Sequence, residues 1–384
     1  MASNAMKIGI DASRAFLKNR TGIEEYSYQV IRHLRESFSE EKVVLYVRKK
    51  LVWESGRLKL EPQRIDFELS ANWEVKGLWA PRFWTQIRLS CEMLLHPVDV
   101  LFVPAHTVPC IHPKQTVVTI HGLEYEFSPE SYSWYERWYM RFSIRNSVCW
   151  AKRVIAVSDN TKRDLIRLYQ VPEEKITVVY EGVEKYRVSS IEYQVLNTKY
   201  SIPNTPYFLF IGRVEERKNV SRIIEAFDNF KQKTGLPHKL ILAGKPGYGY
   251  EKIRYKIQET RYKGDIYELG YITEKKKWEL LKKADVLLFP SLYEGFGLPI
   301  LEAQQVGTPV ITSTTSSLPE IAGEGAILVD PLDSRALAEA MERVVTNPEL
   351  RAGIIDKATR NADRFSWATC ADGVAQLLKS SSPS

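Results

Sequence analysis

The chain has 384 residues, 44% of them hydrophobic, and 54 Lys and Arg against 47 Asp and Glu give a formal net charge of +7. A chain of this length can bury sizeable cores and favours two domains over one. The mild positive charge fits an anionic small molecule or a membrane surface. No dense basic tract predicts a nucleic-acid partner. The 4 cysteines are scattered without a CxxC pair, which argues against a zinc site or a disulfide framework.

No apolar run approaches the roughly 20 residues that span a bilayer, and no signal peptide is visible. We therefore expect a cytoplasmic protein, with a peripheral position on the inner face of the membrane as the alternative.

Short β-rich runs alternate with helical patterns through the first half of the chain. Between the first two runs, Ile23, Tyr26, Val30 and Leu34 fall on one face of a predicted helix. This alternation predicts an α/β fold with a parallel sheet, and a Rossmann-like domain over residues 6–180. We expect its strands at 7–12, 42–47, 99–104, 116–121, 153–158 and 175–180.

A second series of runs follows residue 205 and predicts a second Rossmann-like domain over residues 206–365. We expect its strands at 207–212, 239–244, 266–271, 286–290, 309–312 and 326–330. Residues 181–205 lack periodicity and contain Gly182 and Pro203, so we interpret them as an interdomain linker. The closing helix, 366–380, is expected to pack back on the first domain. Because ligands sit at the carboxyl ends of parallel strands, the two domains are expected to face each other across a cleft.

The segment EGFGLPILE, residues 294–302, places two acids eight residues apart. It follows a strand, Pro299 suits the first turn of a helix, and Gly307 suits the end of that helix. The backbone N–H groups of Phe296, Gly297 and Leu298 would then converge at a helix N-terminus, which is an anion site. Glu294 and Glu302 would border it as acceptors for hydroxyl groups. A ligand that carries both a phosphate and a polyol explains this pattern.

The segment GRVEERKN, residues 212–219, places Arg213 directly after a strand and Lys218 at the start of a helix. Two cations at the mouth of one site would neutralise a diphosphate. The alternative is a solvated charge cluster, because two acids and an arginine lie between them.

Other phosphate and metal motifs are missing from the sequence. No strand leads into GxGxxG and no GxxxxGK[ST] occurs, which disfavours a dinucleotide-dependent dehydrogenase and a P-loop ATPase. No Asp-x-Asp occurs either, so a metal clamp on the diphosphate lacks obvious ligands. We expect no metal and no resident cofactor.

Four ordered segments, TIHGLEYEFSP, GRVEERKN, EGFGLPILEA and SSLPEIAGEGAILVDPLD, together resemble the family 4 retaining glycosyltransferases of GT-B fold. The similarity runs over nearly the whole chain, and Glu294 and Glu302 match the E-x7-E motif of that family. The start of the chain and the segment VSDNTKRDLI are most similar to mannosyltransferase-type members that build bacterial surface polysaccharides.

The resemblance implies roles for individual residues. Arg213 and Lys218 would hold the diphosphate of a nucleotide-sugar donor, Glu294 and His121 would meet the transferred sugar, and Glu302 would meet the ribose. The donor-binding set that the resemblance implies is completed by Gly22, Gly212, Tyr271, Ile272, Phe296, Gly297 and Leu298. The sequence departs from the family pattern at His121-Gly122, where His-Asp is common, and at Thr21-Gly22, where two glycines are common.

The function implied is retaining transfer of a sugar, with GDP-mannose as the favoured donor, to a glycan or lipid-linked acceptor. A nucleotide sugar is then a co-substrate. The alternatives are a transferase that uses a UDP-sugar, a GT-B sugar-nucleotide epimerase, and a non-catalytic glycan-binding module.

The segment 131–153 suggests a further partner. At helical spacing Trp134, Trp138 and Phe142 form one stripe, with a stripe of arginines beside it. Such a helix could lie on an anionic membrane. The alternative is a helix whose aromatic side chains pack into the core while its arginines are solvated.

Overall fold

A computed structural model describes residues 5–17, 20–54, 57–63, 65–80, 82–184 and 205–381. The chain divides into two units. Unit 1 comprises Met1–Tyr125, Tyr132–Gly182 and Ser366–Ser384, and unit 2 comprises Glu126–Ser131 and Val183–Phe365. Most of the predicted linker, 181–205, lies outside the described residues.

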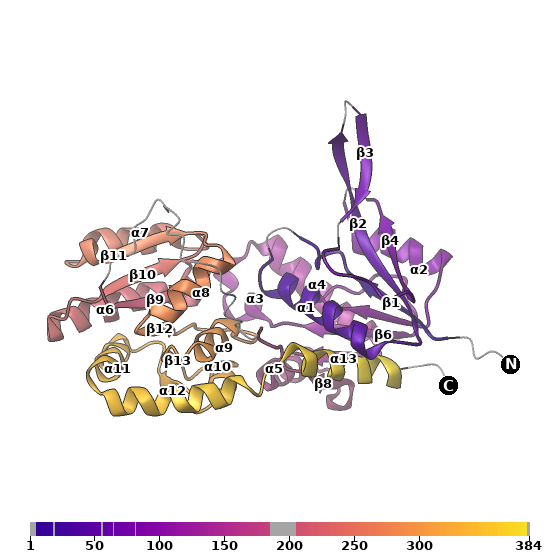
Figure 1. Ribbon diagram of the computed structural model, residues 1–384. Coiled ribbons are helices and arrows are strands. Elements are labelled where there is room, and N and C mark those ends of the chain that lie inside the picture. Colours follow the sequence, from indigo (N-terminus) through magenta and orange to yellow (C-terminus); the bar gives the residue numbers. More distant parts are fainter. Residues whose placement is uncertain are drawn as a thin grey trace. The chain divides into compact units, whose positions relative to one another are not determined.

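Unit 1 is built on one mainly parallel sheet with the strand order β3-β2-β1-β5-β6-β7-β8, and β4 pairs with β2 (Figure 1). In the described part of the chain every pairing of this sheet is parallel except that of β2 with β3, which form a hairpin that extends from the sheet edge (Figure 1). The elements of unit 1 are β1 (Lys7–Asp11), α1 (Gly22–Ser37), β2 (Lys42–Glu54), β3 (Arg57–Pro62), β4 (Trp73–Leu78), η1 (Trp84–Leu89), α2 (Ser90–Leu95), β5 (Val100–Val103), β6 (Gln115–Ile120), α3 (Glu124–Phe127, which straddles the boundary with unit 2), α4 (Trp134–Trp150), β7 (Arg153–Ala156), α5 (Asp159–Tyr169), η3 (Glu173–Lys175), β8 (Ile176–Val178) and α13 (Trp367–Ser380).

Unit 2 is built on a parallel sheet with the strand order β11-β10-β9-β12-β13-β14. Its elements are η2 (Pro129–Ser131), β9 (Tyr207–Ile211), η4 (Glu216–Lys218), α6 (Val220–Thr234), β10 (Lys239–Ala243), α7 (Tyr250–Glu259), η5 (Lys263–Asp265), β11 (Ile266–Gly270), α8 (Glu274–Lys283), β12 (Val286–Phe289), α9 (Leu298–Gln305), β13 (Val310–Ser313), α10 (Leu318–Ala322), β14 (Ile327–Val329), α11 (Ser334–Thr346) and α12 (Pro348–Ala362).

The α/β fold class with two parallel sheets is confirmed, and each of the twelve expected strands is present. The strands β3 and β4 were not expected from the sequence. β4 lies at a sheet edge, and its middle residues are only partly buried, so it lacks the continuous apolar run by which the inner strands are recognised. Among the described residues no helix is both long enough and apolar enough to cross a membrane.

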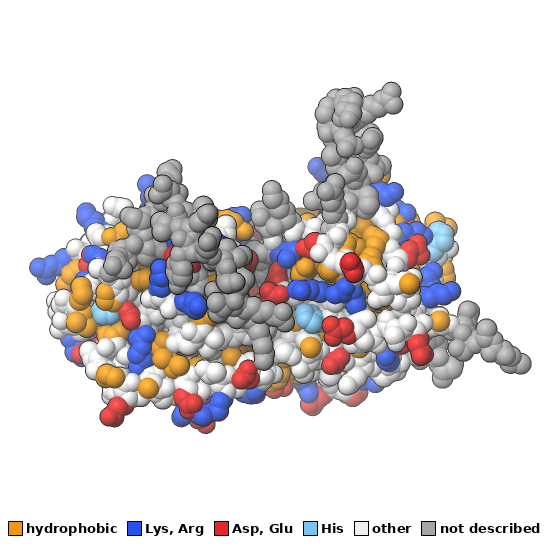
Figure 2. Space-filling view, in the orientation of Figure 1, with side chains coloured by type: hydrophobic (Ala, Val, Ile, Leu, Met, Phe, Trp, Pro, Cys, Tyr) orange, Lys and Arg blue, Asp and Glu red, His pale blue; other side chains and the backbone are white. Residues whose placement is uncertain are grey.

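Charged side chains of both signs are spread over the face shown in Figure 2. On the face shown in Figure 2, Lys and Arg side chains lie among Asp and Glu side chains and are not gathered in one block.

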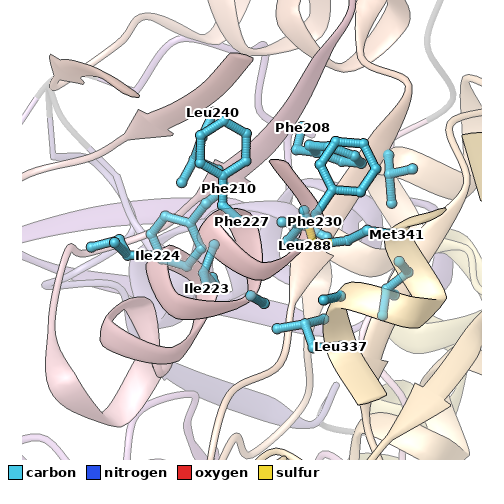
Figure 3. Packing of buried hydrophobic residues seen from close by; sticks show 14 of the residues in the cluster. Phe208, Phe210, Ile223, Ile224, Phe227, Phe230, Leu240, Leu288, Leu337 and Met341 are labelled. Atoms are coloured by element: carbon cyan, nitrogen blue, oxygen red, sulfur yellow. The ribbon is translucent and has the colours of Figure 1, made fainter. Parts of the chain in front are cut away.

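The core of unit 2 lies on both faces of its sheet, because successive side chains of a strand point to opposite sides. Phe208 and Phe210 of β9 pack with helices α6, α7 and α11, and the ring of Phe208 meets that of Phe230 edge-on at 4.9 Å between centroids (Figure 3). Tyr207, Leu209 and Ile211 of the same strand belong to the cluster formed with α8, α9 and α10. With both faces covered, only the ends of the strands remain for a site.

Candidate active site

The candidate site of unit 2 lies where the strand order of the sheet reverses. From the middle of the sheet, β9, β10 and β11 follow one another toward one edge, and β12, β13 and β14 follow one another toward the other edge. The neighbours in the middle are therefore β9 and β12, and all the strands are parallel. Arg213 follows the carboxyl end of β9, and Glu294 follows that of β12. Ligands of open parallel sheets bind at such a reversal, outside the carboxyl ends of the strands.

Lys218 and Glu294 form a buried ion pair across this reversal. The Nζ atom of Lys218 donates to Oε1 of Glu294 in a short contact, and their side chains are 13% and 10% exposed. Burial lowers the pKa of the Lys218 amine, and the attraction of Glu294 offsets this only in part. Burial alone would raise the pKa of the Glu294 carboxyl, but the positive charges of Lys218 and Arg217 outweigh it and the pKa is lowered. The Glu294 carboxyl is therefore ionised at neutral pH, and the Lys218 amine gives up its proton more readily than a solvated lysine.

Two further charged residues of this site were not singled out from the sequence. The guanidinium of Arg217 donates from Nη1 to the carbonyl oxygen of Tyr293 at 2.8 Å and from Nη2 to Oε1 of Glu215 at 2.8 Å. Its Nη1 also lies 3.5 Å from Oε2 of Glu294. In the alternative of a solvated cluster Arg217 and Glu215 would face water, whereas the structure leaves their side chains only 12% and 8% exposed.

Arg213 lies at the exposed edge of the same group. Its side chain is 68% exposed, and its Nε atom lies 3.6 Å from Oε2 of Glu215. The structure thus gives the two cations different settings, with Lys218 buried and Arg213 open to solvent. That both hold one diphosphate remains a prediction.

The EGFG turn has the local geometry that its sequence indicates. Gly297 has φ 125°, in a region that favours glycine, and α9 begins at Leu298 with Pro299 in its first turn. The Ser317 hydroxyl donates to the carbonyl oxygens of Glu294, at 2.9 Å, and Phe296, at 2.6 Å, which fixes the turn from the following loop.

Glu302 has its own cationic partner on another helix. Lys277 of α8 donates from Nζ to Oε1 of Glu302 at 2.6 Å and lies 2.7 Å from Oε2 of Glu274. Burial alone would lower the pKa of Lys277, but the two carboxylates outweigh it and raise that pKa. The two motif glutamates are therefore each paired with a different lysine. No motif in the sequence singles out Lys277.

The ends of β9, β10 and β11 are tied together by glycine backbone. Gly212 donates its N–H to Ala243 at 3.0 Å, and Gly244 donates to Gly270 at 2.8 Å. A side chain at Gly244 is impossible, because its Cβ would lie 1.6 Å from the carbonyl oxygen of Gly212. This close approach explains why the residue packed against Gly212, which was predicted as a donor-binding residue, is also a glycine, Gly244.

Tyr271 and Ile272 follow β11, which is the outermost strand of this sheet. The ring of Tyr271 is 52% exposed, and the Nζ atom of Lys245 lies 4.8 Å from its centroid. Ile272 packs at the edge of the hydrophobic cluster that contains α8. That the backbone near Tyr271 and Ile272 holds the base of the donor remains a prediction.

His121 of unit 1 lies at the carboxyl end of β6 and is buried. Its Nε2 atom lies 2.8 Å from the carbonyl oxygen of Pro104 and its Nδ1 atom 3.1 Å from Oε1 of Glu181. Both partner atoms are oxygens, so each contact becomes a hydrogen bond only when the proton is on the ring nitrogen that makes it. A contact from His121 to a sugar therefore requires that one of these partners be exchanged. Glu181 was not predicted, because it lies 60 positions further along the chain.

Two other residues of unit 1 lie at the same end of the sheet. Burial, together with His121 and Arg14, lowers the pKa of His106 to about 3, so this imidazole is neutral, and its Nδ1 atom is buried without a hydrogen-bond partner. Gly22 opens helix α1 with φ 31°, and a Cβ placed there would meet nothing within 4 Å. The space above Gly22 leaves room for a close approach by a ligand. Among the described residues, no group of three or more His, Cys, Asp or Glu side chains is arranged to hold a metal ion.

Comparison with known proteins agrees with this architecture. The family model described as "Glycosyltransferase Family 4" matches residues 20–187, and that described as "Glycosyl transferases group 1" matches residues 196–361. The O-antigen chain mannosyltransferase B of Escherichia coli is 30% identical over 259 residues, which cover 67% of this chain and 68% of that protein. The O-antigen chain mannosyltransferase RfbU of Salmonella typhimurium is 28% identical over 244 residues, which cover 64% of each.

Solved structures of low identity share the fold. Sucrose-phosphate synthase from Thermosynechococcus elongatus has a TM-score of 0.74 and 19% identity, with 98% of both chains covered. Anabaena Alr3699/HepE in complex with UDP and glucose has a TM-score of 0.71 and 18% identity, with 98% of this chain and 100% of that chain covered. These neighbours show that the two parallel α/β sheets form a GT-B fold. The chain belongs to the family 4, group 1 glycosyltransferases, as its sequence motifs predict.

Proposed function

We propose that the protein transfers mannose from GDP-mannose to a glycan or lipid-linked acceptor with retention of the anomeric configuration. The observation that carries the proposal is the buried Lys218–Glu294 pair at the strand reversal of unit 2. It combines a cation for a diphosphate with a carboxylate for sugar hydroxyls. The names of the two bacterial relatives, both O-antigen chain mannosyltransferases, favour mannose.

The proposed reaction breaks the bond between the anomeric carbon and the diphosphate oxygen and forms a bond from an acceptor oxygen to the same carbon. Negative charge grows on the leaving diphosphate as the bond breaks. Lys218 and Arg213 stabilise this charge, together with the N-terminus of α9. The acceptor approaches from the face of the leaving group, and its proton passes to a phosphate oxygen. A dedicated general base is then not needed.

We propose that this reaction needs no metal ion and no resident cofactor, because protein cations take the place of a metal at the diphosphate. Transfer should persist in excess EDTA. Loss of activity in EDTA with recovery on addition of magnesium or manganese would contradict this charge assignment.

A UDP-sugar is the second candidate for the donor, since the HepE structure contains UDP and glucose. At 18% identity that neighbour supports the fold alone. A thermal-shift series with GDP, UDP, GDP-mannose and UDP-sugars separates the two donors, because a ligand that binds only the folded state raises the melting temperature. A larger shift with the UDP compounds would overturn the GDP-mannose assignment. Turnover of donor without any acceptor would instead indicate an epimerase.

We further propose that unit 1 rests on an anionic membrane surface through two exposed apolar rows. On α4, Trp134, Trp138 and Phe142 are 82%, 57% and 55% exposed, so the alternative that these rings pack into the core is wrong. The second row was not predicted and comprises Phe83, just before η1, together with Ile87 of η1 and Leu94 and Leu95 of α2, all exposed. One loop contacts both elements, because the backbone N–H of Val108 donates to Ser147 of α4 and the carbonyl oxygen of Val108 accepts from Gln86 of η1.

The charges beside these rows favour an anionic surface. The sequence from 132 to 153 has one acid, Glu136, against five basic residues, and Glu136 is taken up by the capping box with Ser133 at the start of α4. Arg141 and Arg145 are exposed. Aromatic rings flanked by arginines are typical of helices that lie in the interface of a bilayer.

Co-sedimentation with vesicles tests the membrane contact. The protein should bind vesicles rich in phosphatidylglycerol and bind phosphatidylcholine vesicles weakly. The double variants Trp138→Ser/Phe142→Ser and Ile87→Ser/Leu94→Ser should each weaken binding, while Tyr255→Ser, on the exposed surface of unit 2, serves as the matched control. Equal and negligible binding of the wild type to both vesicles would refute the proposal.

A further inference from the structure

Five charged side chains of unit 2 alternate in sign from one end of the site to the other. Arg213 lies beside Glu215 at 3.6 Å, Glu215 accepts from Arg217 at 2.8 Å, Arg217 lies 3.5 Å from Glu294, and Glu294 accepts from Lys218. The row begins and ends with the two cations assigned to the donor diphosphate. The three inner members are assigned no contact with the donor diphosphate.

Arg217 is the central member and is fixed from several sides. Its side chain is 12% exposed, and it donates to the Tyr293 carbonyl as well as to Glu215. Its own carbonyl oxygen accepts from the backbone N–H of Leu292 at 2.9 Å. Arg217 therefore joins the turn after β9 to the loop after β12 by both its main chain and its side chain.

Glu294 takes one of the three N–H donors of the Lys218 ammonium group, so a diphosphate has to share this cation with the carboxylate. When Lys218 turns toward a diphosphate, Glu294 loses its closest positive partner in a buried setting. A buried carboxylate without a cation is unstable and either takes up a proton or moves toward water. Arg217 is the second cation beside that carboxylate.

We propose that Arg217 is a positioning residue, which holds the Glu294 carboxylate and its loop in place while Lys218 binds the diphosphate of the donor. This role rests on the proposed function, in which Glu294 meets the transferred sugar. Lysine cannot replace arginine here, because one ammonium group cannot reach Glu215, the Tyr293 carbonyl and Glu294 together. The planar guanidinium presents several donors in a fixed arrangement.

Three variants separate the charge of Arg217 from its geometry. Arg217→Met removes both, Arg217→Lys keeps the charge, and Glu215→Gln releases the guanidinium while leaving it charged. Arg254→Met, whose arginine is 61% exposed on α7, is the matched control. The measurements are calorimetric binding of GDP and of GDP-mannose, and kcat and kcat/KM of sugar transfer as functions of pH. Circular dichroism reports whether each variant folds.

Arg217→Met should bind GDP about as well as the wild type, because Lys218 and Arg213 are intact, but should lose the extra affinity that the sugar contributes. Its kcat should fall on the order of 10²-fold, the loss expected when a reacting group is misplaced by about 1 Å. The acid limb of kcat/KM should move to higher pH, because Glu294 has lost a cation. Arg217→Lys should restore the acid limb but not kcat. Glu215→Gln should lower kcat less.

Two results would overturn this role. If Arg217→Met keeps the kcat and the acid limb of the wild type, Arg217 does not position Glu294. If it loses GDP binding as strongly as GDP-mannose binding, Arg217 contacts the diphosphate directly. Should Arg217→Met fail to fold, the same comparison is made with Arg217→Lys and Glu215→Gln, and wild-type values in both would overturn the role. A wild-type protein that binds no nucleotide and transfers no sugar would refute the proposed function itself, and this role with it.

Discussion

Lys218 is held in a fixed orientation by its surroundings, but its positive charge is also used in an ion pair. Its ammonium group is buried, paired with Glu294 and 5.0 Å from the centroid of the Phe289 ring. A cation in this setting is already oriented before a ligand arrives, so little reorganisation is needed when charge develops on a leaving group. The cost is that its charge is shared with a carboxylate.

Replacing Lys218 should therefore mainly slow the chemical step. Lys218→Ala removes a cation aimed at charge that grows during departure, and by analogy with the loss of one preorganised donor kcat should fall about 10²–10³-fold. Steady-state kinetics in donor measures this, with the exposed Lys252→Ala on α7 as control. A wild-type kcat in Lys218→Ala would contradict the diphosphate site.

The alkaline limb of the pH profile should also belong to Lys218. Because burial lowers its pKa below the ordinary 10.5, the free enzyme loses this cation at a lower pH than a solvated lysine would. As pH rises through that pKa, kcat/KM should fall. Lys218→Arg keeps its charge, so its alkaline limb should move to higher pH even if the rate is lower. An unchanged limb in Lys218→Arg would assign it to another group.

Glu302→Gln should weaken donor binding more than it slows chemistry. Ribose hydroxyls change little between the ground state and the transition state, so KM for the donor should rise while kcat changes less. Lys277→Met is the informative comparison, because it removes the other half of the ion pair. If both variants lower stability equally and neither raises KM, Glu302 serves only to hold α8 to α9.

At the scale of elements, strand ends could be predicted from the sequence, but the direction of side chains after them could not. The apolar run Tyr207–Ile211 identifies β9 and places Arg213 after it. Which of the next charges turns inward depends on Asn219, a left-handed residue with φ 62°. Its side chain donates to the carbonyl oxygens of Pro290 and Pro331, far along the chain. Sequence spacing carries no information on those contacts, so the burial of Arg217 and Glu215 could not be predicted.

The glycine-rich loop 244–249 is a second case. Its sequence fits a mobile loop, but its glycines pack closely against the turn after β9. A Cβ at Gly247 would lie 2.5 Å from Oε2 of Glu215, and one at Gly249 would lie 2.4 Å from Cγ of Glu216. The loop can pack in this way only because Gly247 and Gly249 have no side chain. This constraint follows from the contact between the loop and the turn after β9, and the sequence of the loop alone does not show it.

Gly247→Ala should disturb the site through Glu215. The added methyl group forces Glu215 or the loop to move, at a cost of about 1–3 kcal/mol in the free energy of unfolding. Because Glu215 binds Arg217, kcat should fall as well. Gly264→Ala is the control, since a Cβ there meets nothing within 4 Å. Thermal melts and kinetics that are equal in the two variants would show that the loop adapts freely.

At the scale of the whole molecule, the chain returns to unit 1 after it has completed unit 2. Helix α13 contacts α1, and its residues Trp367, Val374 and Leu378 are buried. The ring of Trp367 lies 6.1 Å from that of Tyr26, and a Cβ at Gly182 would lie 2.1 Å from the backbone nitrogen of Trp367. The core of unit 1 therefore includes residues from both ends of the chain.

Removal of residues 366–384 should destabilise unit 1 and leave unit 2 folded. Hydrogen exchange followed by mass spectrometry should show faster exchange in α1, which loses its packing partner, and unchanged exchange in α6, which packs with α11. Faster exchange in α6 to the same degree would mean that the two units unfold together.

The returning helix also means that the two halves of the polypeptide are not the two halves of the fold. A cut after Glu184 would yield one fragment whose unit 1 is incomplete and a second fragment that carries the missing helix α13 beyond a complete sheet of unit 2. When expressed separately, the fragments should recognise each other through α13 and the α1 surface that it covers. The chain is therefore suited to fragment complementation, in which activity appears only where both pieces are made.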